Sequence, residues 1–184
     1  MPVKKPPTRK STTDAIALLK ADHAKVKQLF SQFESAKGAK KQEVFNQIFK
    51  ELQVHTKVEE EIFYPAVKKI DKEGANEAFE EHNIVDFILG AMKKLSPSDE
   101  AYDAKFTTLK ENVEHHIEEE EGEMFPEAQE KIPAAQMEEL GTKMQERKDK
   151  LMAAGSRPAR SSSATKTASR PATSRSRKAP AASR

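Results

Sequence analysis

Four histidines and two glutamates in this sequence have the residue types and the spacing of metal ligands. His55 and Glu59 are four residues apart, and His116 and Glu120 repeat the same separation. Four residues are about one helical turn, so each pair lies on one face of a helix. Imidazole nitrogen and carboxylate oxygen bind Fe, Mn and Zn, so cation binding is the chemistry that these residues favour. Two single histidines complete the set: His23 and His82.

The two His-Glu pairs belong to an internal repeat. The segments His55-Thr-Lys-Val-Glu-Glu-Glu-Ile-Phe-Tyr-Pro65 and His116-Ile-Glu-Glu-Glu-Glu-Gly-Glu-Met-Phe-Pro126 both read H-x-x-x-E-E-x-x-apolar-aromatic-P. The single histidines repeat more faintly, as Asp22-His23-x-x-Val26 and Glu81-His82-x-x-Val85. A chain that contains two copies of a helix pair predicts a pseudo-twofold axis through the fold.

Four helices are predicted to position these residues. Apolar side chains recur with three- and four-residue spacing in stretches of about 16–33, 45–62, 75–92 and 102–120. Short connectors make neighbouring helices antiparallel, so we expect an all-α, up-down-up-down four-helix bundle. Residues 133–152 are predicted to form an appended C-terminal helix. The first helix has three candidate N-caps, Thr12, Thr13 and Asp14, and the connectors are Lys37-Gly38-Ala39, Lys72-Glu73-Gly74 and Ser96-Pro97-Ser98-Asp99.

The four histidines occupy inward-facing positions at similar heights. His23 lies about 14 residues before the first connector and His55 about 16 after it. His82 and His116 lie about 14 residues before and 17 after the third connector, so a rise of 1.5 Å per residue places all four imidazoles in one layer. Burying unpaired carboxylates in that layer costs several kcal/mol, out of a typical stability of about 5–15 kcal/mol. Cations remove this cost, and their binding becomes part of the folding free energy.

The doubled H-x-x-x-E-E motif with two single histidines resembles the hemerythrin-like, HHE cation-binding domain family over roughly residues 13–130. The resemblance implies a non-haem pair of iron ions with an oxo or hydroxo bridge, Mn or Zn being less favoured. It implies that His23 and His55 bind one iron and that His82 and His116 bind the other. Glu59 and Glu120 would bridge the two ions.

Two positions depart from the oxygen-carrying hemerythrins. Those proteins have a second histidine where this chain has Asp86, and a longer H-x-x-x-x-D spacing in the fourth helix, which His115 and Glu120 would reproduce. We prefer His116 to His115 because the internal repeat selects it, and we expect His115 to pair with Glu119. Asp86 is expected to be exposed or bonded to a histidine N–H rather than bound to metal. Each ion would then keep an open position, which favours peroxide or nitric oxide reactivity over reversible oxygen carriage.

Other side chains near the motifs are expected to have structural roles. We interpret the remaining acids as a solvated acidic face, and the aromatic and apolar residues that follow each motif as core lids over the polar layer. Pro65 and Pro126 are expected to bend their helices just past it. The acids are Glu60, Glu61, Glu118, Glu119, Glu121 and Glu123, and the lids are Phe63, Tyr64, Met124 and Phe125.

Basic residues are concentrated at the two ends of the chain. Twelve of the 32 lysines and arginines lie in residues 1–12 and 153–184, whereas all 30 acidic residues lie between these arms, so the body has a net charge of about −10. Residues 153–184 contain no aromatic or large aliphatic side chain, so both arms are predicted to be disordered. The C-terminal arm is a solubilising extension, folds back onto the acidic body, or binds nucleic acid or another polyanion without sequence preference.

The sequence leaves three classes of function open. The first is a di-iron protein that binds, senses or reacts with O2, peroxide or NO, or handles iron. The second is an enzyme that acts on peroxide or repairs iron–sulfur centres, and the third is a nucleic-acid-associated stress protein. We favour a metal- and gas-binding protein over a dedicated enzyme. With no cysteine, no apolar run of about 18–20 residues and no signal-peptide pattern, we expect a cytoplasmic protein without membrane association.

Overall fold

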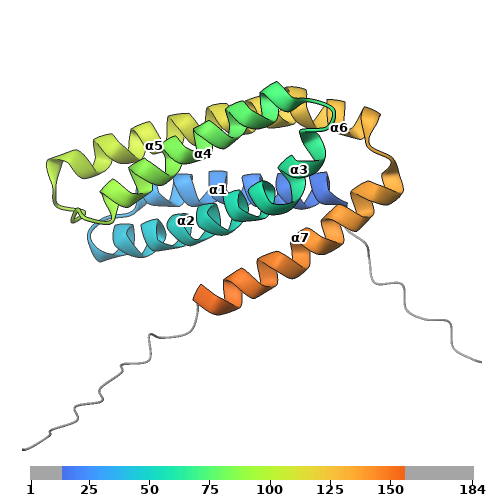
Figure 1. Ribbon diagram of the computed structural model, residues 1–184. Helices are drawn as coiled ribbons and strands as arrows, with labels where there is room; N and C mark the ends of the chain where they lie inside the picture. The colour runs from blue at the N-terminus through green and yellow to red at the C-terminus, as the bar shows by residue number, and fades with distance from the viewer. Residues whose placement is uncertain (1–13, 156–184) are drawn as a thin grey trace, which may run out of the picture.

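The computed structural model describes residues 14–155, which form helices and no strand. Four long helices make a bundle in which α1 and α2 form one antiparallel hairpin and α4 and α5 form the other, stacked above it in Figure 1. The predicted all-α bundle is confirmed. The bounds are α1 Ala15–Ser35, α2 Ala39–Val58, α4 Lys72–Met92 and α5 Glu100–Glu119.

Aspartate side chains cap the first helix of each hairpin. The Oδ1 atom of Asp14 accepts a hydrogen bond from Ala17 N at 3.0 Å, so Asp14 is the N-cap of α1. Asp71 caps α4 in the same way, through Gly74 N at 2.9 Å. The prediction of a connector at 72–74 was therefore wrong, because these residues form the first turn of α4. Gly74 is suited to this turn because a Cβ there would collide with the Asp71 carboxylate.

Each H-x-x-x-E-E motif ends in one turn of π-helix. The turns η1 (Glu59–Phe63) and η2 (Glu120–Met124) begin at the motif glutamates and continue into the short helices α3 (Tyr64–Val67) and α6 (Phe125–Lys131). A proline ring clashes with the carbonyl four residues before it in an α-helix. Pro65 and Pro126 lie at the starts of α3 and α6, where the wider turn accommodates the ring. Single π turns of this kind are frequent at functional sites.

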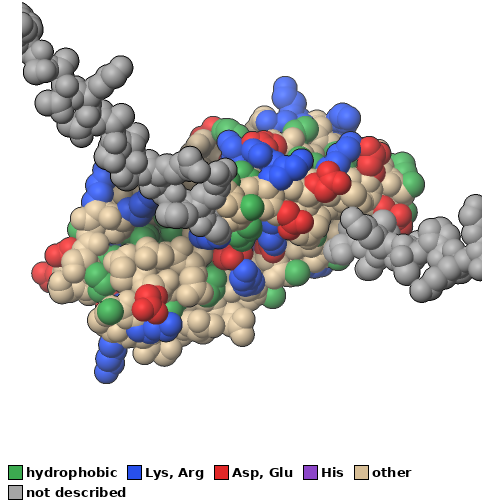
Figure 2. Space-filling model, turned by 90° about the horizontal axis from the view of Figure 1, so that it is seen from below, with side chains coloured by type: hydrophobic (Ala, Val, Ile, Leu, Met, Phe, Trp, Pro, Cys, Tyr) green, Lys and Arg blue, Asp and Glu red, His purple; other side chains and the backbone are tan. Residues whose placement is uncertain are grey.

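The appended helix α7 (Ala134–Gly155) packs across α1 and α2, below the bundle in Figure 1. It continues three residues past the predicted limit of 152, since Ala153 and Ala154 are strong helix formers. Basic and acidic side chains are interspersed on the face seen from below (Figure 2). The arm predicted at 1–12 and the rest of the C-terminal arm lie outside the described residues. None of the described helices is long and apolar enough to cross a bilayer.

The buried apolar residues form two clusters with a polar layer between them. One cluster lies toward the α1–α2 and α4–α5 connectors and includes Phe30, Phe45 and Leu89. The other lies toward α3, α6 and α7 and includes Phe63, Phe125 and Met144. The side chains between the clusters are therefore fixed by close packing above and below, which holds them in position without support from loops.

Candidate metal centre

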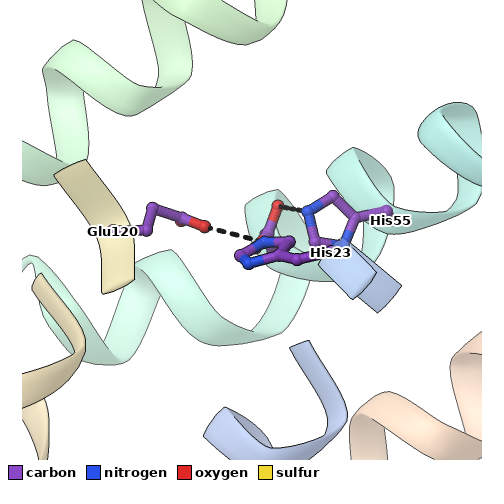
Figure 3. Close-up of side chains that lie close together, drawn as sticks. His23, His55 and Glu120 are labelled. Atoms are coloured by element: carbon purple, nitrogen blue, oxygen red, sulfur yellow. Dashed lines mark ion pairs between the residues drawn. The ribbon is translucent and has the colours of Figure 1, made fainter. Parts of the chain in front are cut away.

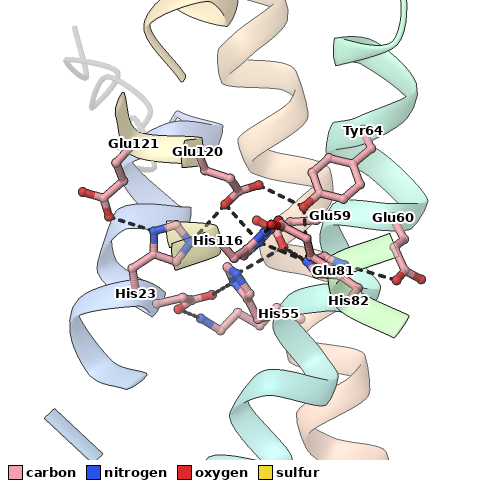
Figure 4. A network of polar contacts seen from close by, with 12 residues as sticks. His23, His55, Glu59, Glu60, Tyr64, Glu81, His82, His116, Glu120 and Glu121 are labelled. Carbon is pink, nitrogen blue, oxygen red and sulfur yellow. Dashed lines mark hydrogen bonds and ion pairs between the residues drawn. The ribbon is translucent and has the colours of Figure 1, made fainter. Parts of the chain in front are cut away.

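The structure brings the six predicted ligand residues together in one buried layer (Figure 4). Each of the four bundle helices contributes one histidine, and the first residue of each π turn contributes a glutamate. No more than 5% of any of these residues is exposed. The residues are His23, His55, Glu59, His82, His116 and Glu120.

The histidines form two pairs, and each glutamate lies between one member of each pair. The ring centroids of His23 and His55 are 4.9 Å apart, and those of His82 and His116 are 4.8 Å apart. Glu59 Oε2 is 3.1 Å from His55 Nε2 and 3.4 Å from His82 Nε2. Glu59 therefore contacts one histidine of each pair.

Glu120 reaches the remaining two histidines. Its Oε2 atom is 3.3 Å from His23 Nε2, the contact drawn in Figure 3, and 3.6 Å from His116 Nε2. Both carboxylates therefore span from one histidine pair to the other. Two ligands about 2.1 Å from one ion, at roughly a right angle, are themselves about 3 Å apart. The spacing of 3.1 to 3.6 Å between these carboxylate oxygens and the nearby nitrogens is compatible with ligands that converge on common ions.

A second set of acids surrounds the four imidazoles and forms hydrogen bonds with three of them. His23 Nδ1 lies 2.8 Å from Glu121 Oε1, and His116 Nδ1 lies 2.7 Å from Glu81 Oε2. Each Nδ1–H donates outward, so each Nε2 lone pair faces the layer, as metal-ligating histidines require. His82 Nδ1 makes a third contact of this type, with Glu60 Oε1 at 3.2 Å, whereas His55 Nδ1 has no hydrogen-bond partner among the described residues and lies 3.8 Å from Asp22 Oδ2.

Sequence reasoning missed this outer set. Glu60 and Glu121 were expected on a solvated face, but they are partly buried against the histidines. The sequence contained one signal that could have found these acids, since each of the four is next in sequence to a residue of the central layer. The acids obey the pseudo-twofold axis as well. Asp22 corresponds to Glu81, and Glu60 corresponds to Glu121.

Tyr64 and Phe125 occupy equivalent places in the repeat and make the two halves different. The Phe125 ring stacks on His23, with centroids 5.8 Å apart. The Tyr64 hydroxyl instead donates a hydrogen bond to Glu120 Oε1 at 2.9 Å and lies 3.2 Å from His82 Nε2. Tyr64 was expected only as an apolar lid, and its hydroxyl adds a buried proton donor to one side of the layer.

The appended helix also distinguishes the two halves. Lys148 of α7 forms an ion pair with Asp22, the acid that faces His55. Arg147 contacts both carboxylate oxygens of Glu61, at 2.6 and 3.0 Å. This helix therefore covers the His23–His55 side of the layer with two cationic side chains, and that placement was not predicted.

Burial and mutual repulsion give the central carboxylates different proton affinities. Burial, reinforced by the charge of Glu120, raises the pKa of Glu59 well above its usual value. Burial also acts to raise the pKa of Glu120, but His116 and His23 outweigh it and hold that pKa at about 2. Burial lowers the pKa of His55 to about 4. Without a cation, a proton is therefore held more tightly on Glu59 than on Glu120.

The layer contains polar atoms that the protein itself does not satisfy. Within the described residues, both carboxylate oxygens of Glu59, Glu120 Oε2 and His23 Nε2 are buried without a hydrogen-bond partner. Such atoms each cost about 1–3 kcal/mol when left unpaired. Cations that accept these lone pairs remove the cost, so the donor set fits metal ions.

The two less favoured candidate ligands are not brought to the layer. Asp86 is exposed and accepts a hydrogen bond from Gln53 Nε2. His115 is 64% exposed, and its Nε2 lies 3.2 Å from Glu119 Oε1. The expected pairing of His115 with Glu119 is thus present in the structure.

The comparisons with known proteins agree with the geometry. The profile of the hemerythrin HHE cation binding domain matches residues 14–128. The chain belongs to the hemerythrin HHE cation-binding family. A crystal structure of an HHE cation binding domain-containing protein from Mycobacterium kansasii is 28% identical and superimposes with a TM-score of 0.70. That match covers 77% of this chain and 89% of the other.

A longer protein also contains a region similar to this HHE chain. It is a DNA nickase from Nostoc sp. (strain PCC 7120 / SAG 25.82 / UTEX 2576), 30% identical over 136 residues. The match covers 73% of this chain but only 39% of the nickase. The similarity therefore involves a minor part of that protein's length.

Cation binding to this HHE layer should release protons. Glu59, His23 and His116 all have raised pKa values, and for the two histidines the nearby Glu120 charge outweighs burial, which acts in the opposite direction. Only the deprotonated groups bind metal, so we expect at least about one proton released per centre at neutral pH and tighter binding as pH rises. Calorimetric titration in two buffers of different ionisation enthalpy measures this release. Identical binding heats in both buffers would contradict it.

The hydroxyl of Tyr64 should stabilise the metal-free HHE domain. Tyr64→Phe removes the hydrogen bond to Glu120, so we expect a loss of about 1 kcal/mol in the free energy of unfolding, measured with urea. Tyr102→Phe is the matched control, because the Tyr102 hydroxyl is buried without a hydrogen-bond partner among the described residues. That control should be neutral or stabilising. Equal losses in the two variants would show that the bond to Glu120 contributes nothing.

Proposed function

We propose that this domain binds two iron ions and uses them to bind, sense or react with O2, peroxide or NO. The observation that carries the proposal is the position of Glu59 and Glu120, each lying between one histidine of each pair. One ion would be held by His23 and His55. The other would be held by His82 and His116, with the two carboxylates shared between them.

A small void beside the layer supports a small, weakly polar ligand. It measures about 10 Å³, which is close to the space that one water-sized molecule needs. All four histidines line it, together with the apolar side chains of Val26, Leu52, Val85, Val113 and Ile117. A void of this size favours the smallest ligands and leaves no room for larger metabolites.

The bound irons would supply redox chemistry and open coordination positions, and the protein controls what reaches them. The two apolar clusters exclude bulk water from the layer. The outer acids hold His23, His82 and His116 in the tautomer that directs Nε2 inward. The Tyr64 hydroxyl donates a hydrogen bond to Glu120 Oε1 at 2.9 Å and keeps its proton, because burial and the charges of Glu120 and Glu59 raise its pKa well above the usual value.

The ligand count favours reaction or sensing over reversible carriage. Since Asp86 is exposed and His115 lies outside the layer, neither adds a further ligand. Each ion would then have two histidines and two shared carboxylates, which leaves room for solvent and for an incoming molecule. Iron held by these residues would supply redox chemistry and would keep an open position on each ion, which favours reaction or sensing.

Metal analysis of protein purified without chelator tests this proposal directly. We expect close to two irons per chain, with visible and near-ultraviolet charge-transfer absorption. His55→Ala should remove both the metal and the absorption, whereas His115→Ala, an exposed histidine outside the layer, should retain them. Protein that takes up neither iron nor another divalent cation would refute the proposal.

A second candidate function is association with nucleic acid. It is supported by the similarity to part of a DNA nickase and by the eight basic and no acidic residues in segment 153–184. Relaxation of supercoiled plasmid by the iron-loaded chain would extend this candidate to strand cleavage. Intact plasmid after incubation with iron-loaded protein would limit it to binding.

A further inference from the structure

A cavity of about 80 Å³ lies between α4 and the segment formed by α5 and η2, and it leads to His116 and Glu120 of the central layer. Its lining is strongly acidic, and none of the described residues that form it is a lysine or arginine. A recess lined by one sign of charge concentrates ions of the opposite sign. The acids are Asp71, Glu77, Glu81, Glu119, Glu120 and Glu123.

The acids are arranged from the surface inward. Glu77 and Glu123 are exposed, Glu81 and Glu119 are partly buried, and Glu120 is only 1% exposed. The buried Oε2 atom of Glu120 has no hydrogen-bond partner among the described residues, so the inner end of the cavity carries an unsatisfied acceptor. This oxygen lies 3.3 Å from His23 Nε2 and 3.6 Å from His116 Nε2, so a cation bound there would be shared with the histidines of the layer.

A group of possible ligands lies at the edge of this cavity, where Glu81 and Glu119 form part of its lining and the exposed His115 lies beside Glu119. Glu81, His115 and Glu119 each offer one ligand atom, and these atoms lie within 4.8 Å of one another. Glu81 also contacts His116 Nδ1 at 2.7 Å, so this group adjoins the central layer directly. The spacing is close enough for one cation to contact all three side chains.

The opposite side of the layer lacks these properties. There, α7 packs against α1 and α2, and Lys148 and Arg147 neutralise Asp22 and Glu61. A cation that approached His23 and His55 from that side would meet a helix and two positive charges. The two sides of the pseudo-symmetric layer are therefore unequal in access and in charge.

We propose that the acidic cavity is the route by which divalent cations enter the centre, with Glu81, His115 and Glu119 as a transient site on the way. This inference rests on the proposed function, because it needs a central site that binds cations. Ions would reach the His82–His116 side first. The His23–His55 side would then fill from within the layer, across the shared glutamates.

Rapid mixing of the full-length, metal-free protein with Co²⁺, followed by its visible absorption, tests the route. The triple variant Glu77→Gln, Glu119→Gln, Glu123→Gln keeps every residue of the central layer and also Glu81. We expect its association rate to fall about tenfold at low ionic strength and the difference to shrink in high salt. The final stoichiometry should equal that of the wild type.

A control variant with the same change in net charge distinguishes entry through the acidic cavity from general electrostatic attraction of cations to the protein. Glu43→Gln, Glu111→Gln and Glu138→Gln remove three exposed acids that do not line the cavity, and this variant should load at nearly the wild-type rate. Equal rates in the two triple variants would overturn the route.

His115→Ala tests the transient site and should slow cation loading severalfold. Loading at the wild-type rate would show that His115 takes no part in a transient site. Wild-type protein that binds no Co²⁺ would instead refute the proposed function.

Discussion

Glu59→Gln should abolish the two-cation centre while leaving the metal-free protein at least as stable as the wild type. The folded protein binds a proton at Glu59 more tightly than the unfolded chain does, because burial and the Glu120 charge raise the pKa of Glu59 well above 4.5. The unfolded chain releases that proton above about pH 4.5, so Glu59 reduces folding stability as pH rises from there through the raised pKa. A neutral glutamine removes this loss, but it is a poor bridging ligand.

Glu120→Gln should lose cations as well, but it should also weaken the metal-free fold. The positive imidazoles of His116 and His23 outweigh burial and hold the pKa of Glu120 at about 2, so its charge stabilises the folded protein above pH 4.5 and that contribution is lost as pH falls toward 2. Removing the charge leaves buried His23 without its partner at 3.3 Å. We expect a loss on the order of 3 kcal/mol at neutral pH.

Thermal unfolding with and without Fe²⁺ under anaerobic conditions measures both effects. A free ion concentration of 100 times Kd stabilises the wild type by about 2.7 kcal/mol per site, which raises Tm by about 5–10 °C. Both variants should lose most of this rise, and only Glu120→Gln should have a lower Tm without metal. The interpretation fails if Glu59→Gln destabilises the metal-free protein as much as Glu120→Gln does.

The central layer was predictable from the sequence because its signals are periodic and local. His55 and Glu59 share a helical face by their spacing alone, and the short connectors place His23 opposite His55. The preference for His116 over His115 followed from the repeat, and the structure buries the first and exposes the second. Predictions of this kind need only helix geometry and the position of each connector.

Adjacency to the central residues marked the outer acids as candidates, but the sequence could not predict which acid meets which histidine, because these contacts join distant segments. His23 meets Glu121 across 98 positions of sequence, and Asp22 meets Lys148 across 126. Which acid reaches which imidazole depends on how each helix is rotated, and a composition-based view can only place such acids on a solvated face. The error at Gly74 has another origin. Glycine is typical of loops, but here its missing side chain makes room for the Asp71 cap within a helix.

Deleting residues 156–184 should remove the largest part of any affinity for nucleic acid. The eight basic residues of the C-terminal arm all lie in this segment, whereas the body carries a net charge of about −10 and is repelled by phosphate. If all eight contact phosphate, binding of the full chain to duplex DNA should weaken by roughly 10³–10⁵-fold between 50 and 200 mM salt. Electrophoretic retardation across this salt range measures the effect.

A charge-neutral arm of the same length is the decisive control for that deletion. Changing the eight arginines and lysines of 157–184 to glutamine preserves chain length but removes the counterion release that drives phosphate binding. The neutral-arm variant should therefore bind DNA as poorly as the deleted chain. Neither variant should lose iron, since all six proposed ligands lie in the bundle. Retained DNA binding in the neutral-arm variant would assign recognition to the body, where the basic side chains interspersed with acidic ones (Figure 2) would have to overcome a net charge of about −10.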